Sequence, residues 1–227
     1  MKLSVIVPVY NEINTIQEIL RRVKEVPIEK EILIVDDFST DGTREYLKSI
    51  EGEQGIRVFY HPRNMGKGSA IRTAVANVGG DVVIIQDADL EYDPGDYHKL
   101  VAPIAEGKAS VVYGSRYSNP ENELPLTRFK IGVLLLTALA NLLYGAGITD
   151  EATCYKVFKT DVIKRIPLKC KRFEFCPEVT AKIRKRGYRI EEVPISFKYR
   201  TIKEGKKIGW RDGVEAVIAL LKYRIMD

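Results

Sequence analysis

The sequence predicts an α/β fold: a doubly wound, mostly parallel sheet flanked by helices. Two observations support a parallel sheet. Short apolar runs of strand length recur along residues 1–115, and a helix-like segment separates most of them. The runs are nearly continuous instead of alternating with polar residues, which is typical of parallel strands covered on both faces. With 45% hydrophobic and 30% charged residues among 227, the composition is that of a globular protein with a substantial core.

The first strands each lead into a helix. Asn14 and Gln17 have the spacing of a capping box at the start of the first helix. Residues 39–43 offer several N-caps for a second helix that runs to Ile50. The alternation predicts β–α units and a doubly wound sheet. Strands are expected at residues 3–9, 32–35, 56–60, 82–85 and 110–113.

Two more helices are expected before residue 110. One opens at residues 66–68 and runs to Val78, where a glycine pair stops it. The other starts at Asp93, which is followed by Pro94 at the first helical position, and runs to about Glu106.

Residues 131–148 contain no charged side chain and are long enough for a transmembrane helix. A single crossing there would place residues 149–227 across the bilayer from the acidic residues of the first half. Asn141 and three glycines also weaken a spanning helix. A buried helix or one lying on a membrane surface is therefore favoured.

The last third is expected to hold two helices and an edge strand. Residues 174–186 form a helix that ends at Gly187, and Pro194 marks the extended segment 189–199 as an edge strand. Residues 210–226 form a final helix with an apolar stripe, for which core packing is favoured and membrane contact is the alternative. The stripe consists of Trp210, Val214, Val217, Ile218 and Leu221.

Three carboxylates follow the strand at 82–85. Asp87, Asp89 and Glu91 would repel one another unless a cation lay among them, and oxygen ligands suit Mg²⁺ or Mn²⁺. A solvated acidic turn is the alternative. In doubly wound sheets ligands bind beyond the carboxyl ends of the strands, where residues 36–37 and 114–116 are also expected.

The charge distribution and the cysteine content limit the possible partners and the cellular compartment. Residues 1–150 carry 16 Lys and Arg against 21 Asp and Glu, whereas residues 151–227 carry 20 against 10. The basic last third suits an anionic membrane surface, a phosphorylated substrate or nucleic acid, and a solvated basic surface is the simpler alternative. Cys154, Cys170 and Cys176 have no zinc-site spacing, which fits a reducing cytoplasm. The N-terminus has no signal-peptide pattern, so export is not expected.

Five motifs in register resemble the inverting family 2 glycosyltransferases with the GT-A fold. Among these, the polyprenyl-phosphate and dolichyl-phosphate glycosyltransferases, such as the dolichyl-phosphate mannose synthases, are the most similar. The motifs are VPVYNE at residues 7–12, VDDFSTDGT at 35–43, NMGKG at 64–68, DADL at 87–90 and GSR at 114–116.

The resemblance implies a site for a nucleoside diphosphate sugar. Asp89, with Glu91, is implied to hold Mg²⁺ or Mn²⁺ beside the donor diphosphate, although many relatives have Gln at the position of Glu91. Arg200 and either Lys206 or Lys207 are implied to close over the donor. The residues implied to line the nucleotide-sugar pocket are Pro8, Tyr10, Glu12, Val35, Asp37, Asp87, Ala88 and Asp89.

The resemblance also implies a lipid phosphate as acceptor, held by Arg116 and Arg128. With Asp89 these two arginines are the implied catalytic residues. A monoalkyl phosphate has a second pKa of about 6, so it can attack without a strong general base. His61 and His98 are accordingly expected to be structural. Asp150 is expected either to bind a sugar hydroxyl or to cap a nearby helix.

The expected function is transfer of a hexose, with inversion, from GDP-mannose or UDP-glucose to dolichyl or polyprenyl phosphate. We expect one GT-A domain over residues 1–227, with 1–117 binding the donor and 118–227 forming a helical extension toward acceptor and membrane. The protein is expected on the cytoplasmic face of a membrane as a peripheral protein, with a membrane-anchoring partner subunit as one route and with no nucleic-acid partner.

Two other functions are alternatives to the transfer of a hexose to a lipid phosphate. One is a glycosyltransferase of the same fold with a non-lipid acceptor such as a cell-surface polysaccharide. The other is a haloacid-dehalogenase-type phosphatase, whose paired aspartates would follow the first strand, whereas Asp87 and Asp89 follow the fourth.

Overall fold

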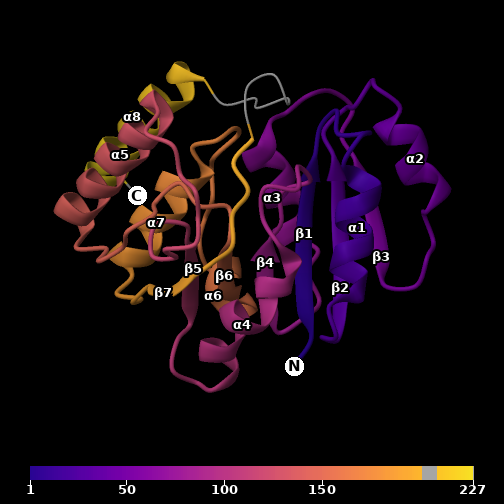
Figure 1. Cartoon of the computed structure of the whole chain (residues 1–227), viewed down its shortest axis with the longest axis horizontal. Helices are drawn as coiled ribbons and strands as arrows, with labels where there is room; N and C mark the ends of the chain where they lie inside the picture. Colours follow the sequence, from indigo (N-terminus) through magenta and orange to yellow (C-terminus); the bar gives the residue numbers. More distant parts are fainter. Residues whose placement is uncertain (201–208, 227) are drawn as a thin grey trace.

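The computed structural model describes residues 1–200 and 209–226. Its centre is a seven-stranded sheet in the order β3-β2-β1-β4-β6-β5-β7, with helices on both faces (Figure 1). The strands are β1 (Leu3–Val9), β2 (Lys30–Asp36), β3 (Ile56–Tyr60), β4 (Val82–Ile85), β5 (Val111–Ser115), β6 (Lys156–Lys159) and β7 (Glu191–Pro194). The helices are α1 (Ile16–Glu25), α2 (Thr43–Ser49), α3 (Lys67–Val75), the 3₁₀ turn η1 (Pro94–Asp96), α4 (Tyr97–Ala105), α5 (Arg128–Tyr144), α6 (Thr160–Lys164), α7 (Phe175–Lys185) and α8 (Trp210–Ile225).

The mostly parallel sheet is confirmed, and the six predicted strands are all present, with the predicted edge strand appearing as β7 at one end of the sheet. β6 was not predicted. It runs antiparallel to both β4 and β5 and lies between them. Two successive antiparallel pairings leave β4 and β5 pointing the same way, so the segments after β1, β2, β4 and β5 all emerge at one edge of the sheet. This edge carries the predicted acidic residues.

Several predicted helix ends were wrong. α1 begins at Ile16 with Thr15 as its N-cap residue, and the described side chains form no capping box there. Thr15 instead donates its hydroxyl to the Glu12 carboxylate at 3.0 Å. α3 ends at Val75, three residues early. Asp93 does cap the next turn, accepting a hydrogen bond from the Gly95 amide at 2.9 Å, although that turn is a 3₁₀ turn.

The uncharged run ends in a reversal of the chain. Gly145 ends α5 with φ of +58°, and the Asn141 side chain hydrogen-bonds both the N–H and the C=O of Ile148. Asn141 thus folds the residues after α5 back on the helix. Among the described residues, no helix combines the length and the apolar character needed to cross a membrane.

The predicted core face of α8 was wrong. The stripe from Trp210 to Leu221 is exposed, with 75% of Trp210 and 56% of Ile218 accessible to solvent. The buried face instead consists of Ala216, Ala219, Leu220 and Tyr223. Small alanines allow α8 to pack closely on α5 and α7, which lie beside it at one end of the molecule (Figure 1).

Candidate active site

A cavity of about 1290 Å³ opens at the carboxyl edge of the sheet and extends between α5 and α8. Val35 was expected to line the site but is fully buried in β2 and is not part of the cavity wall. Lys206 and Lys207 lie outside the described residues. The remaining predicted residues all line the cavity: Pro8, Tyr10, Glu12, Asp37, Asp87, Ala88, Asp89, Glu91, Arg116, Arg128 and Arg200.

Asp37 fastens the loop that precedes α3. Its carboxylate accepts hydrogen bonds from the amides of Met65 at 2.8 Å and Gly66 at 2.7 Å. The Nδ1 atom of His61 lies 2.7 Å from the same carboxylate, and its Nε2 atom lies 3.0 Å from the Thr73 hydroxyl. His61 is therefore a structural residue, as expected, and it supports a wall of the cavity.

The N-terminus of α3 is closed to phosphate. The amides of Gly68 and Ser69 donate to the carbonyl groups of Arg172 and Lys171, each at 3.0 Å. Glycine is required at position 66, because φ is +89° and a Cβ atom would lie 2.4 Å from the Lys171 carbonyl oxygen. With its amides engaged, this turn cannot act as a phosphate-binding loop.

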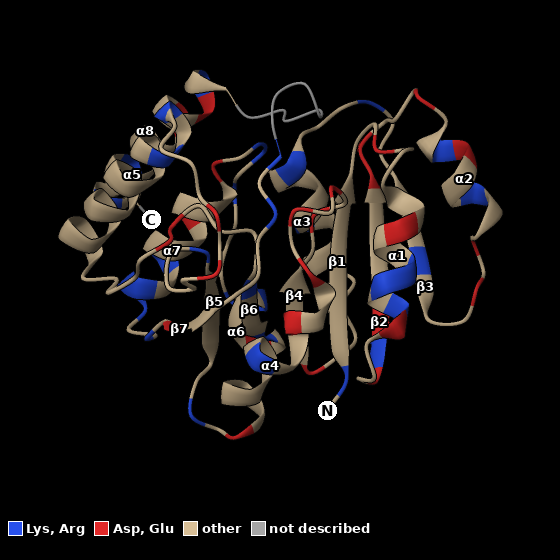
Figure 2. Ribbon diagram, in the orientation of Figure 1, with Lys and Arg blue, Asp and Glu red and all other residues tan. Residues whose placement is uncertain are grey.

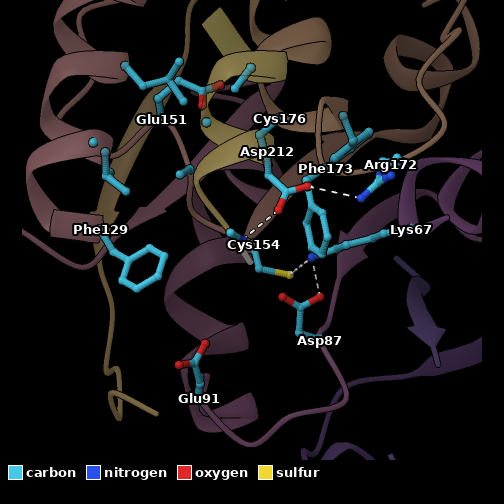
Figure 3. A pocket seen from close by; sticks show the side chains of 18 of the residues that line it. Lys67, Asp87, Glu91, Phe129, Glu151, Cys154, Arg172, Phe173, Cys176 and Asp212 are labelled. Carbon is cyan, nitrogen blue, oxygen red and sulfur yellow. Dashed lines mark hydrogen bonds and ion pairs between the residues drawn. The ribbon is translucent and has the colours of Figure 1, made fainter. Parts of the chain in front are cut away.

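Lys67 enters the site through its side chain. Its ammonium lies 2.5 Å from Asp87 Oδ1 and 3.9 Å from the sulfur of Cys154 (Figure 3). Burial is the largest single influence and would lower the pKa of Lys67, but Asp87 together with Cys154 and Cys176 outweighs burial and raises that pKa well above its usual value. Asp87 therefore has a close cationic partner that the sequence analysis missed. The only sequence signal was a lysine between two glycines.

Asp89 has a looser cationic partner. A guanidinium nitrogen of Arg200 lies 3.2 Å from Asp89 Oδ2, and the other terminal nitrogen lies 3.5 Å from Glu12 Oε2. The Arg200 amide donates to Glu91 Oε1 at 2.9 Å, and the Glu91 amide donates to Asp89 Oδ1 at 3.2 Å. Burial first, and then the charges of Asp87 and Glu91, raise the pKa of Asp89 to about 7, although Arg200 opposes the shift.

This acidic group fits a divalent cation. Burial, followed by the charges of Asp87 and Glu91, disfavours the ionised form of Asp89 and so raises its pKa. A cationic guanidinium already contacts Asp89 Oδ2. Within the described part of the chain no three His, Cys, Asp or Glu side chains form a complete metal cage. Mg²⁺ commonly takes one or two carboxylates and completes its coordination with substrate phosphates and water, which Asp89 and Glu91 would allow.

Arg116 is held by Asp150. Its Nε and a terminal nitrogen lie 2.6 and 2.7 Å from the two carboxylate oxygens, and its amide donates to Asp150 Oδ2 at 3.1 Å. The guanidinium also lies over the rings of Phe197 and Tyr117. Asp150 is fully buried and caps none of the helices in the described residues, so the capping alternative was wrong. Both of its carboxylate oxygens bind Arg116.

The second end of the cavity is apolar. Arg128, the first residue of α5, lines the cavity together with apolar side chains of α5 and α8. Leu135, Leu136, Leu139, Val214, Val217 and Ile218 form this apolar channel. The cavity thus joins a charged chamber at the sheet edge to an apolar channel between two helices.

Glu151 is a buried carboxyl group on the cavity wall that the sequence analysis did not single out. Its Oε1 atom accepts from the Thr180 hydroxyl at 3.1 Å, whereas Oε2 has no hydrogen-bond partner in the described structure. Burial raises its pKa to about 7, against the opposing effect of Lys156. Nothing in the local sequence signals this environment, which arises from the packing of α5 and α7 over residue 151.

The arrangement of strands and helices is shared with solved structures of glucosyl-3-phosphoglycerate synthase from Mycobacterium tuberculosis. One, in complex with Mn²⁺, UDP and phosphoglyceric acid, has a TM-score of 0.75 at 20% identity and covers 98% of this chain and 78% of its own. Another, with Mn²⁺, UDP-glucose and glycerol 3-phosphate, has a TM-score of 0.76 at 18% identity, covering 100% and 81%. The shared fold is the GT-A fold.

Sequence comparison identifies the family. The model of Glycosyl transferase family 2 matches residues 4–166, so the chain belongs to this family and is a glycosyltransferase. A UDP-N-acetylglucosamine–dolichyl-phosphate N-acetylglucosaminyltransferase of Methanococcus voltae is 31% identical over 86% of this chain and 84% of its own length. The low-salt glycan biosynthesis hexosyltransferase Agl6 of Haloferax volcanii is 31% identical over 92% of this chain and 51% of its own.

Proposed function

We propose that this glycosyltransferase passes a sugar from a nucleoside diphosphate to a polyprenyl or dolichyl phosphate, with inversion at the anomeric carbon. One observation carries the proposal: a single cavity joins the charged chamber to the apolar channel. An acceptor with a phosphate head and a hydrocarbon tail matches both ends. The name of the Methanococcus voltae relative, which acts on dolichyl phosphate, supports this acceptor class.

The donor diphosphate belongs beside Asp89, Glu91 and Arg200. Asp89 and Glu91 would hold Mg²⁺ or Mn²⁺, which, when bound, neutralises negative charge on the departing diphosphate. Arg200 reaches this chamber from the segment after β7 and offers guanidinium donors to the same phosphates. Asp87, fixed by Lys67, faces the space in which the nucleotide sugar would lie.

We place UDP-linked sugars first as donors and retain GDP-mannose as the alternative. The expectation from sequence was GDP-mannose or UDP-glucose. The Methanococcus voltae relative is named for UDP-N-acetylglucosamine, and the Mycobacterium tuberculosis neighbour was crystallised with UDP-glucose. Both names favour the uridine nucleotide, and they leave glucose and N-acetylglucosamine as the two candidate sugars.

The acceptor phosphate belongs beside Arg116 and Arg128. Asp150 orients the Arg116 guanidinium, whose remaining donors can bind phosphate oxygens. A phosphate oxygen then forms a bond to the anomeric carbon as the bond to the leaving diphosphate breaks on the opposite face. The bonding electron pair departs with the diphosphate. The attacking phosphate is ionised near neutral pH, so this step needs no side-chain base.

A lipid acceptor requires access to a membrane, and the α5–α8 end is suited to a bilayer surface. Leu135 on α5 is 67% exposed, and the apolar stripe of α8 lies beside exposed Arg211, Lys222 and Arg224. Figure 2 shows basic residues on the helices at this end of the molecule. Apolar side chains next to basic ones match the interface of an anionic leaflet. Peripheral attachment to the cytoplasmic face therefore remains our proposal, with an anchoring partner subunit as the alternative. Residues 1–117, except Arg116, would serve the donor, and residues 118–227, except Arg200, would serve the acceptor and the membrane.

Donor binding tests the first half of this function. Calorimetric titration of UDP and of GDP in the presence of Mn²⁺ should give measurable binding of one nucleotide, and Asp89→Asn should abolish the contribution of the metal. Equal binding of both nucleotides without metal would contradict the donor-site proposal.

Acceptor use tests the second half. Incubation with UDP-glucose or UDP-N-acetylglucosamine and a polyprenyl phosphate should yield a lipid-linked sugar, detected by mass spectrometry, with the inverted anomeric configuration by NMR. Transfer to a polysaccharide fragment but not to the lipid would favour the non-lipid acceptor. Release of inorganic phosphate in place of sugar transfer would favour a phosphatase.

A further inference from the structure

Arg200 contacts Oδ2, one of the two carboxylate oxygens of Asp89 that could bind a divalent cation. Asp89 Oδ1 accepts from the Glu91 amide at 3.2 Å, and Oδ2 faces a terminal nitrogen of Arg200, also at 3.2 Å. A cation that binds Asp89 through Oδ2 must therefore compete with the guanidinium. The two side chains are only 14% and 15% exposed, so the competition takes place where water screens charge weakly.

The Arg200 contacts are poor ones for a buried guanidinium. Charge-assisted N–H···O bonds are usually about 2.7–2.9 Å long, whereas those of Arg200 measure 3.2 Å to Asp89 and 3.5 Å to Glu12. Its Nε atom is buried and has no hydrogen-bond partner among residues 1–200 and 209–226. An unpaired buried donor disfavours this arrangement, so the guanidinium can leave at low cost once a better acceptor is present.

Lys67, by contrast, makes a close ion pair with the other aspartate of the motif, Asp87. Its ammonium lies 2.5 Å from Asp87 Oδ1. The two aspartates of the motif thus differ: Asp87 has a tight partner and Asp89 has a displaceable one.

Building on the donor site proposed above, we propose that Arg200 is a surrogate cation that holds the metal position of the empty enzyme and is exchanged for the divalent ion during loading. The incoming ion replaces the guanidinium on Asp89. The released guanidinium, with its unpaired Nε, then binds the diphosphate of the nucleotide. Metal and nucleotide consequently bind with a positive coupling that passes through Arg200, in addition to their direct contact.

Binding of Mn²⁺ alone, measured by calorimetry or by the EPR signal of free Mn²⁺, tests the exchange. Arg200→Gln should bind Mn²⁺ about threefold to tenfold more tightly than the wild type, because the competitor is gone. At saturating Mn²⁺, the same variant should bind the donor nucleotide more weakly than the wild type does. That nucleotide is UDP, or GDP if the donor titration shows that the protein binds GDP. If Arg200 had only a structural role, its replacement would weaken the binding of both Mn²⁺ and the nucleotide. Tighter Mn²⁺ binding together with weaker nucleotide binding therefore identifies the exchange. Unchanged or weaker Mn²⁺ binding by Arg200→Gln would overturn the proposal.

Arg172→Gln is the matched control. Arg172 lines the same cavity but contacts Asp212 and Glu215 instead of Asp89, so its removal should leave Mn²⁺ affinity within about twofold (Figure 3). If both variants tightened Mn²⁺ binding equally, a general loss of positive charge would explain the result and the exchange would be refuted.

The side chain itself provides a direct readout. In protein labelled with ¹⁵N-arginine, the Nε–H signal missing from Arg200→Lys identifies Arg200. Diamagnetic Mg²⁺ should shift that signal in the wild type, and no shift at saturating Mg²⁺ would overturn the proposal. If neither Mn²⁺ nor UDP or GDP bound the wild type, the donor site would fail together with the exchange. If they bound normally and only the Arg200 effects were missing, the exchange alone would fail.

Discussion

The guanidinium of Arg116 and the carboxylate of Asp150 form a two-point ion pair, with N···O distances of 2.6 and 2.7 Å, across 34 residues of sequence. Asp150 is fully buried, whereas the Arg116 side chain is 13% exposed and reaches the cavity. The pair therefore fixes the direction in which the arginine presents its remaining donors.

Removing the Asp150 charge should impair both folding and acceptor binding. Asp150→Asn leaves a largely buried guanidinium without its counter-charge, a change that typically destabilises by about 3–5 kcal/mol. The acceptor KM should rise by roughly 10–100-fold, because a misplaced Arg116 no longer holds the phosphate in line. Urea denaturation and acceptor titration at saturating donor measure the two effects. The double variant with Arg116→Gln should be less destabilised than the sum of the single variants; strict additivity would show that the pair is not coupled.

Lys67 should be required for nucleotide binding although it was not recognised in the sequence. Lys67→Met leaves Asp87 unpaired beside Asp89 and Glu91, and this uncompensated negative charge should weaken UDP binding by about tenfold or more. Adding Asp87→Asn to Lys67→Met should restore part of the lost affinity, because it removes the unpaired charge. Calorimetry on the three proteins provides the comparison, and undiminished affinity in Lys67→Met would contradict the assignment.

Glu151 should make the protein less stable as pH rises from about 4.5 to 7. Its pKa is raised from 4.5 to about 7 in the folded state, so over this range the folded protein retains a proton that the unfolded chain has lost. The folded state therefore binds more protons, and the free energy of unfolding falls with rising pH, by up to about 3 kcal/mol. Below pH 4.5 both states are protonated, and above 7 the penalty is constant.

The neutral variant Glu151→Gln should flatten this dependence. Urea denaturation at pH 5 and pH 8 would show a smaller decrease in stability for the variant than for the wild type. An identical decrease in the two proteins would mean that other groups cause it.

Two adjacent leucines of α8 should separate folding from membrane binding. Leu220 is fully buried, and Leu220→Ala should reduce the free energy of unfolding by about 2–5 kcal/mol. Leu221 is 48% exposed, and Leu221→Ala should change stability by less than about 0.5 kcal/mol. Only an exposed position can contact lipid directly, so the folded Leu221→Ala protein, combined with Ile218→Ala, should bind anionic vesicles more weakly in a flotation assay. Unaltered flotation would argue against this face as the membrane contact.

The parallel strands were predicted well because each buried strand appears in the sequence as a continuous apolar run. The apolar runs at 3–9 and 82–85 match β1 and β4 residue for residue, and the acidic residues after 85 fall at the expected edge. β6 escaped because its four residues begin and end with lysine, and the burial of Lys156 depends on a carbonyl partner at Glu151 that no local pattern encodes.

The apolar face of α8 was assigned wrongly because both faces of the helix are apolar. Periodicity favours the face with the larger side chains, whereas packing selected Ala216 and Ala219, which allow a close approach to the neighbouring helices. The ion pairs of Lys67 with Asp87 and of Arg116 with Asp150 were also beyond sequence reasoning. Each joins residues from different elements, and only the folded topology brings them together.

The antiparallel strand β6 has a further consequence as a molecular spacer. Neighbouring strands lie about 4.8 Å apart, so inserting β6 between β4 and β5 separates those two strands by about 10 Å. The carboxylates that follow β4 and Arg116, which follows β5, therefore emerge from the sheet about two strand spacings apart. In the proposed reaction, the strand order would then set the distance between the donor site and the acceptor site.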